Sequence, residues 1–362
     1  MRIYVKNVFR VLRYALFCAG LAAGVLFVAA PFSCTLTDEG IAVVAFDRSA
    51  PKILSFGTTQ CSVLAIACDE PITLMDVACK KAGESDVFTR DIAITYDETR
   101  RNAKITLGRP TEIGEKYELS GIIVDTNNNT LAFALPFTGY NDHLARVILS
   151  ELRHGHSGAD VKSRKAEFVE MYVLAGGNLG GLELYGGYYG NKTRYEFPAI
   201  EVETGEYITV HLRNYYGDTD ERGTVLNQPS ASPDANNAAR DLWVAGSDEG
   251  YFTKNDVVVI VDTVSGAMQD AVLLSEDENK AWSRTLHKTL ANKAVSTGVW
   301  QGGAERSSAA NSDKMGISTT LSRQNIAEVV AAYAAGEARA VTAGKADWML
   351  AAASPGQKNN RP

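Results

Sequence analysis

Residues 166–187, AEFVEMYVLAGGNLGGLELYGG, decide the fold class of the larger part of the chain. Two apolar runs of strand length flank a turn rich in glycine, and no amphipathic helix follows the turn. Residues 256–262, DVVVIVD, form a nearly continuous apolar run, which is typical of a strand buried on both faces. The larger part of the chain is therefore expected to be mainly β.

The region from residue 41 to residue 140 shows the same character in shorter units. Its apolar or alternating runs are separated by charged or asparagine-rich breaks, and it contains no convincing amphipathic helix. These runs are residues 41–47, 61–68, 91–97, 103–108, 117–125 and 130–137. Regular short strands of this kind predict an all-β sandwich over residues 41–145.

Residues 116–137, KYELSGIIVDTNNNTLAFALPF, resemble the end of bacterial Ig-like modules of the S-layer type. Asp125 and the three asparagines 127–129 are expected to form the turn before the last strand, because both residue types tolerate left-handed backbone. The same oxygen-rich loop leaves a calcium site open as an alternative.

Residues 146–362 resemble the lamin-tail domain, an Ig-like β-sandwich. The opening motif comprises Ile148, Ser150, Glu151 and Leu152, followed by Glu167, Phe168, Val169, Glu170, Tyr172, Asn178, Leu179, Leu182 and Leu184. The closing motif comprises Ser322, Arg323, Asp347, Trp348, Ser354, Pro355, Gly356 and Asn359. The resemblance implies a scaffolding role in protein or nucleic-acid interactions, without chemistry.

This stretch is longer than a usual lamin tail, so two insertions are expected, near residues 214–245 and 276–340. The first is rich in Gly, Asp, Asn, Pro and Ser and predicts a long exposed loop. Within the second, residues 276–294 and 323–340 are predicted to be helices. The predicted architecture is thus two Ig-like β-sandwiches in tandem, preceded by an N-terminal signal or anchor helix.

The N-terminus has the pattern of an export signal. Four basic residues and no acidic residue occur in residues 1–33, and residues 14–30 carry no charge. Ser33 and Cys34 follow the apolar run and resemble a bacterial lipoprotein cleavage site. We expect a signal peptide over 1–33, a lipid on Cys34 and a tether over 34–40. Cleavage after Ala30, or an uncleaved apolar anchor, are the alternatives.

Composition excludes several classes of function. The net charge of −7 argues against binding nucleic acid through a positive field. Five cysteines without a CxxC pair indicate neither a disulfide scaffold nor a zinc site, and Cys61, Cys68 and Cys79 are either partly paired or free and buried. Neither GxGxxG nor GxxxxGK[ST] occurs, so no nucleotide cofactor is expected.

The chemistry-bearing residues allow two interpretations. Glu151 and Glu170 could form a catalytic carboxylate pair, but the lamin-tail resemblance implies that these glutamates and Glu167 have structural roles. His154 and His156 could bind one metal ion with Asp160 as a third ligand, although their glycine-rich surroundings favour a solvated loop.

Aromatic residues in glycine-rich sequence are the candidates for ligand contact, because rigid amphipathic rings suit binding loops. They are Tyr185, Tyr188, Tyr189, Tyr215, Tyr216 and Trp243. The prediction is a lipid-anchored envelope protein, periplasmic or on the outer surface, that is not an enzyme and binds a protein or a glycan through loops. The alternative is a metal-dependent envelope hydrolase with its site around His154 and His156.

Overall fold

The structure is a computed structural model that describes residues 32–37, 40–45, 49–84, 87–88, 91–157, 165–213, 236, 239–244, 250–337 and 341–361. Side chains are described for these residues from 49 onward, apart from 87–88. The expected signal sequence up to residue 31, together with Asp160, Tyr215 and Tyr216, lies outside the described residues. No helix in the described ranges is both long and apolar enough to cross a membrane.

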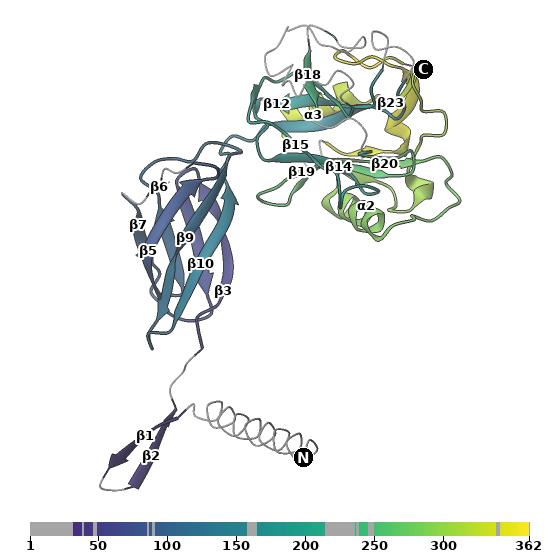
Figure 1. Cartoon of the computed structure of the whole chain (residues 1–362). Coiled ribbons are helices and arrows are strands. Elements are labelled where there is room, and N and C mark those ends of the chain that lie inside the picture. The colour runs from purple at the N-terminus through teal and green to yellow at the C-terminus, as the bar shows by residue number, and fades with distance from the viewer. Residues whose placement is uncertain are drawn as a thin grey trace, which may run out of the picture.

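The prediction of a mainly β protein is confirmed (Figure 1). The two larger apolar cores among the described residues lie in residues 53–137 and 144–350. Each core lies between two sheets, as in a β-sandwich.

The first sandwich packs one four-stranded sheet against another. The first sheet has the order β3 (Ile53–Gln60), β4 (Val63–Cys68), β8 (Asn102–Thr106), β7 (Ala93–Tyr96). The second has the order β10 (Thr130–Thr138), β9 (Lys116–Asp125), β5 (Ile72–Lys81), β6 (Val87–Phe88). All neighbouring strands are antiparallel.

Strands β3 and β5 carry no clear signal in the sequence. In β5 the pairing register shifts between Met75 and Ala78, and Asp76 has a positive φ of 51°. Such a bulge interrupts the alternation of apolar and polar residues on which strand prediction depends.

The N-terminal segment differs from the expected tether. Residues 34–37 belong to β1 (Phe32–Thr37), which pairs with β2 (Gly40–Ala45) in an antiparallel two-stranded ribbon. The run at 41–47, predicted as the first strand of the sandwich, thus forms most of β2 and joins neither four-stranded sheet. Cys34 lies opposite Val43 in this ribbon.

The second sandwich packs a six-stranded sheet against a five-stranded one. The six-stranded sheet has the order β18 (Arg240–Trp243), β17 (Tyr207–His211), β12 (Phe168–Ala175), β11 (Arg146–Arg153), β23 (Thr319–Arg323), β25 (Trp348–Ala352). The five-stranded sheet has the order β15 (Tyr195–Glu196), β14 (Leu182–Gly186), β19 (Val257–Asp262), β20 (Met268–Ser275), β22 (Ala310–Asn311). Two short pairs complete it, β13 (Gly177–Asn178) with β16 (Glu201–Val202) and β21 (Trp300–Gln301) with β24 (Ala343–Gly344).

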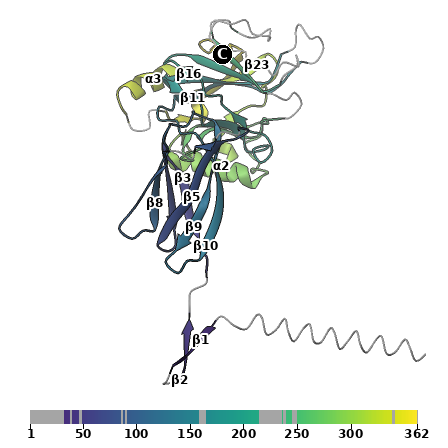
Figure 2. The ribbon, with the colours of Figure 1, turned by 60° about the vertical axis from the view of Figure 1, so that its left-hand side comes forward.

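Two helices cover the outer faces of these sheets (Figures 1 and 2). Helix α2 (Thr285–Thr297) packs on β19 and β20, which explains why β20 is buried along its whole length and β19 is buried up to Val261. Helix α3 (Ile326–Ala334) packs through Val329 on Ile148 and Leu174 of the six-stranded sheet.

Both helices are shorter than predicted. The expected start at residue 276 is a turn in which the Asp277 carboxylate accepts a hydrogen bond from the Asn279 amide. Gly298 ends α2 in the left-handed conformation, and Gly336, with φ of 71°, follows α3. Tyr333 of α3 is 36% exposed.

Candidate ligand-binding site

The outer face of the six-stranded sheet carries Glu151 and Glu170, the two glutamates that the sequence offered as a carboxylate pair. Side chains alternate along β12, so Val169, Met171 and Val173 enter the core while Glu170 and Tyr172 point outward. A register shift in β11 between Leu149 and Glu151 turns Glu151 to the same outer face, opposite Glu170.

Glu151 and Glu170 hold the C-terminal segment against this face. The Glu151 carboxylate accepts hydrogen bonds from the amide and hydroxyl of Ser354 and from the Thr320 hydroxyl. The Glu170 carboxylate accepts hydrogen bonds from the Gly356 amide and the Ser150 hydroxyl. Both glutamates are fully buried. These contacts attach the tail to the sheet, which is a structural role.

Burial raises the pKa of both carboxyl groups. The pKa of Glu170 lies well above its usual value, because desolvation and the neighbouring Glu151 both disfavour its ionised form. Desolvation also raises the pKa of Glu151, although bonds from Thr320 and Ser354 oppose the shift.

Asn359 completes the attachment of the tail. Its side-chain amide donates to the carbonyls of Ser150 and Arg323, at 2.9 and 2.8 Å. Arg323 in turn is buried in an ion pair with Asp270 of β20, with 2.8 Å between Nη1 and Oδ2. Residues 354–359 are thus held by side chains of β11 and β12 and by a main-chain carbonyl of β23.

A groove of about 360 Å³ runs between this tail and helix α3. Tyr172 and Tyr207 form its floor, with their ring centroids 5.1 Å apart in an edge-to-face arrangement. Ile326, Ala327 and Val330 form the helical wall. This volume lies within the ~300–1,000 Å³ of small-molecule sites.

The rim of the groove carries unpaired polar groups. Lys358 and Arg361 project from the tail, and neither has an ion pair with a residue that the structure describes. Glu328 of α3 belongs to the same lining and is exposed. Burial, with Glu170 and Tyr172 nearby, raises the pKa of Tyr207 to about 12, so its hydroxyl stays protonated.

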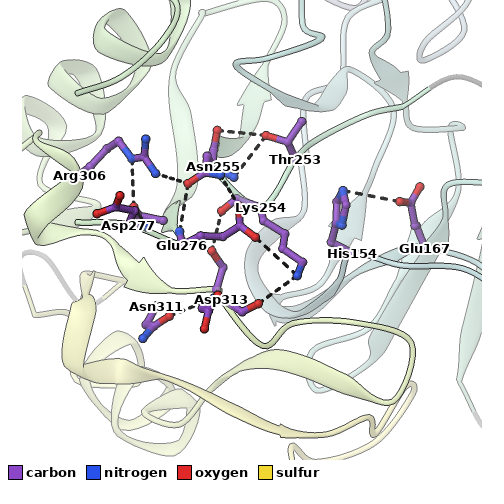
Figure 3. Close-up of polar contacts among 12 residues, drawn as sticks. His154, Glu167, Thr253, Lys254, Asn255, Glu276, Asp277, Arg306, Asn311 and Asp313 are labelled. Carbon is purple, nitrogen blue, oxygen red and sulfur yellow. Dashed lines mark hydrogen bonds and ion pairs between the residues drawn. The ribbon is translucent and has the colours of Figure 1, made fainter. Parts of the chain in front are cut away.

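The two candidate metal ligands lie near Glu167, to which the sequence assigned only a structural role; Figure 3 shows the contact from His154. Glu167 Oε1 lies 3.9 Å from His154 Nε2 and 4.0 Å from His156 Nδ1. The register supplies the reason: Arg153 pairs with Phe168, so the next residues outward are His154 and Glu167. Asp160, expected as third ligand, lies outside the described residues.

The geometry around Glu167 is that of an ion-pair cluster. Glu167 Oε2 accepts a hydrogen bond from Arg213 Nε at 3.0 Å. Burial lowers the pKa of His154, and the positive charge of Lys254 adds to this effect, whereas Glu167 opposes it. Among the residues that the structure describes, no group of three or more His, Cys, Asp or Glu side chains is arranged to hold a metal ion.

Beside His154, a second polar cluster joins the start of β19 to the end of β20 (Figure 3). Lys254 Nζ lies 3.6 Å from Glu276 Oε1 and donates to the carbonyl of Asp313. Asn255 donates to Glu276 and accepts from Arg306. These bonds connect loops to one another, which indicates a structural role for the cluster.

The predicted ligand-contact aromatics in residues 185–189 pack against the protein itself. Tyr185 is 8% exposed and belongs to the core, which corrects its assignment as a contact residue. Tyr188 and Tyr189 pack edge to face at 4.7 Å, and the Arg284 guanidinium lies 3.8 Å from the Tyr188 ring. The Asp256 carboxylate accepts a hydrogen bond from the Tyr188 amide, and this bond holds the loop in place.

Trp243 has a similar role at the sheet edge. Its ring stacks on His211 at 4.1 Å, and His211 Nε2 lies 2.9 Å from Asp241 Oδ1. His211 and Asp241 are buried on β17 and β18, which pair in parallel. The stack closes this end of the sheet.

The candidates in the first sandwich are also structural. Asp125 Oδ1 accepts hydrogen bonds from the backbone amides of Asn127 and Asn129. Asn128 has a φ of 63°, so the loop is an Asx-type turn. Cys61, Cys68 and Cys79 are free thiols. Burial raises the pKa of Cys68 and of Cys79 to about 11, which makes both thiols unreactive.

A second cavity, of about 290 Å³, lies between the two sandwiches. Its lining includes Phe137 from the first and Phe197 from the second. Lys116 Nζ and Glu196 Oε2 pair within it at 3.3 Å, and Glu183 of its lining pairs with Arg194, so its charged groups already have partners. The groove beside α3 is therefore the better candidate for a ligand site.

Comparison with known proteins assigns the second sandwich to a family. Residues 145–350 match the family model described as the TP_1001 protein second domain, and this match covers more than half of the chain. The chain belongs to this family. The match begins one residue before β11 and ends within β25, so the TP_1001 second domain contains both large sheets of the second sandwich.

A curated relative is an uncharacterized protein of Treponema pallidum (strain Nichols), 29% identical over 198 residues. The alignment covers 52% of this chain and 48% of the relative, so the chain spans about half the length of the relative it matches.

Two solved structures show weaker similarity. A DUF4876 family protein from Bacteroides thetaiotaomicron VPI-5482 matches 71% of this chain and 84% of its own, at 13% identity and a TM-score of 0.28. The N-terminal part of the bacterial S-layer protein SbsC matches 34% and 41%, at 13% identity and a TM-score of 0.24. TM-scores this low do not establish a shared fold.

Proposed function

We propose that the protein is exported, is held at the cell envelope by a lipid on Cys34, and acts there as a non-catalytic binding or scaffolding module. Its binding surface is the groove between helix α3 and the C-terminal tail. Export is supported by the basic and then apolar N-terminal sequence, and lipidation by the Ser33-Cys34 pair that follows it.

The groove is the single observation that carries the binding function. Its floor is aromatic, and Lys358 and Arg361 on its rim have no ion-pair partner among the described residues. A polar rim around an apolar floor is typical of ligand sites. The buried carboxylates Glu151 and Glu170, by contrast, are occupied in holding the tail.

The alternative function is that of a metal-dependent hydrolase, and one contact favours it: Glu167 lies beside both His154 and His156. The bond from Arg213 to Glu167 accounts for that carboxylate without a metal. Metal content of the purified chain from residue 35 onward, with and without His154→Ala/His156→Ala, decides between the two. Stoichiometric metal that the double variant loses would favour the hydrolase.

Lipidation is tested in the producing bacterium by incorporation of labelled palmitate. We expect labelling of the wild-type chain and its loss in Cys34→Ala. A variant with unchanged labelling would refute the anchor. Cys18→Ala is the control, because residue 18 lies within the expected signal sequence and should leave labelling unchanged.

The binding function is tested by filling the groove. Ala327→Trp places a large side chain in the groove from an exposed position on α3, whereas Ala331→Trp changes an exposed residue of the same helix outside the lining. We expect Ala327→Trp to lose the envelope material that immobilised wild-type protein retains, and Ala331→Trp to keep it. Equal retention by all three proteins contradicts a role for the groove.

A further inference from the structure

We infer that the groove between α3 and the C-terminal tail binds a sugar acid, that is, a saccharide ring that carries a carboxylate. This inference deepens the proposed function and rests on it for the role of the groove as a binding site. Four features support this inference. They are the aromatic floor, the strands beneath it that are paired on both edges, the two cations without an ion-pair partner in the described part of the chain, and the Glu328 carboxylate on the opposite rim.

The floor of the groove offers tyrosine rings and hydroxyls to a ligand, but the strands beneath it have no open edge with which a ligand could pair. Tyr172 and Tyr207 present amphipathic faces, and neither hydroxyl donates a hydrogen bond to a described residue. Strand β12 pairs with β11 and β17, while β17 pairs with β12 and β18. A peptide therefore cannot add to either strand, and a ligand must be recognised through side chains alone.

The cationic rim is held in place before any ligand arrives. Asn359, between Lys358 and Arg361, is tied to Ser150 and Arg323. The Gln324 side chain also donates to the carbonyl of Asn360, at 3.1 Å. Two cations on an anchored segment can meet one carboxylate with charge-assisted hydrogen bonds at little ordering cost.

The opposite rim narrows the class of ligand. Glu328 adds an exposed carboxylate to the lining, which repels a second negative charge on the same sugar ring. A carboxylate can also accept hydrogen bonds from ligand hydroxyls. One anionic group on a hydroxylated ring satisfies Lys358, Arg361 and Glu328 together. An acidic peptide brings its charges without the hydroxyls.

The test is calorimetric titration of the purified chain from residue 35 onward with tetragalacturonate as the probe. Fully methyl-esterified tetragalacturonate retains the rings and lacks the charge. Inorganic phosphate and an acidic hexapeptide represent the other ligand classes. We expect tetragalacturonate to bind at least tenfold more tightly than each of the three.

Variants assign the binding to the groove. Lys358→Ala/Arg361→Ala should weaken tetragalacturonate binding at least tenfold and leave the binding of the methyl ester unchanged. Ala327→Trp should abolish both, while Ala331→Trp should leave both as in the wild type. Thermal unfolding followed by tryptophan fluorescence establishes that each variant is folded.

Each remaining outcome overturns the inference. Equal affinity for acid and ester would remove the role of Lys358 and Arg361. Tighter binding of the hexapeptide would make the ligand a peptide, and absence of tetragalacturonate binding would exclude a sugar acid. In the last two cases, the loss of envelope material by Ala327→Trp would still support the groove as a binding site, so the two proposals fail separately.

Discussion

The two sandwiches bury their polar residues to very different extents. Among the described residues 49–140, only Thr111 and Asp125 are buried and polar. The second sandwich buries glutamates, aspartates, arginines and histidines, among them Glu151, Glu170 and Arg323. The first is therefore held by apolar contact between two sheets, as its alternating pattern implies.

The buried charges of the second sandwich attach segments that do not belong to its sheets. Glu151 and Glu170 hold residues 354–356 of the tail, and Arg323 bonds to the carbonyl of Val341, after α3. Desolvating a charge is costly, and directional bonds offset that cost only in one arrangement. The comparison teaches that apolar patterning forms the packed sheets, whereas buried charged groups hold the tail and the segment after α3 in place on the sheets.

Two probes separate the sandwiches in the intact chain. All four tryptophans, at residues 243, 282, 300 and 348, lie in the second sandwich. Cys68 and Cys79 are buried in the first. Tryptophan fluorescence during denaturation therefore follows the second sandwich, and reaction of the two thiols with a thiol reagent follows the first.

The largest effect is expected from Arg323→Met, which leaves the Asp270 carboxylate buried without its partner. Breaking a buried ion pair on one side costs about 3–5 kcal/mol. The fluorescence transition should move to lower denaturant while the thiol transition stays in place. Arg323→Met/Asp270→Leu should recover part of the loss, and a single variant as stable as the wild type would contradict the ion-pair argument.

The counterpart in the first sandwich is Leu119→Ala, at a fully buried position of β9. Removing a leucine side chain from a core costs about 2–5 kcal/mol. Here the thiol transition should move and the fluorescence transition should not. Leu54→Ala, at a residue 67% exposed, is the control and should shift neither. A shift of both transitions by Leu119→Ala would mean that the sandwiches unfold together.

Glu170→Gln tests the pH dependence of the second sandwich. The folded pKa of Glu170 is raised above the usual 4.5, so its contribution to stability is complete below that pH and is lost as the pH rises through the folded pKa. The glutamine cannot ionise. The midpoint of denaturation followed by tryptophan fluorescence should therefore fall less steeply as the pH rises above 4.5. Asp270, whose pKa burial also raises, leaves a residual slope. Glu196→Gln, at an exposed glutamate, should keep the wild-type slope.

The smallest effect is expected at the turn in the first sandwich. Asp125→Ala removes the acceptor of the Asn127 and Asn129 amides, which should cost about 1–2 kcal/mol in the thiol transition. Asn127→Ala keeps that backbone bond and should be nearly neutral. Added calcium should leave the wild-type midpoint unchanged, and a clear increase would revive the calcium alternative.

The sequence located those strands whose pattern is regular. The run at 256–262 contains β19, which is buried up to Val261, and the run at 117–125 lies within β9. It failed at β5, where the bulge at Asp76 breaks the alternation. It started the first helix too early and ended the second too late, because propensity does not register the Asp277–Asn279 bond before α2 or Gly336 after α3.

The candidate site was less predictable than the fold. In the sequence, Tyr172 belongs to the opening lamin-tail motif but is not marked as a binding residue. No motif or pattern includes Tyr207. The pairing of His154 with Glu167 could have been found by extending the antiparallel register one residue beyond Arg153 and Phe168. The groove itself joins residues more than one hundred positions apart, and no local pattern encodes such a distance.

Periodic apolar sequence by itself determined that the chain forms sheets, because alternation states which side chains leave water. The N-terminal sequence likewise determined by itself that this end of the chain is first basic and then apolar. Only the tertiary structure decided that Glu151 and Glu170 anchor a tail and that Tyr172, Tyr207, Lys358 and Arg361 share a groove. The reason is physical: a charge or a ring acquires its role from the partners that packing brings to it, and those partners come from distant strands.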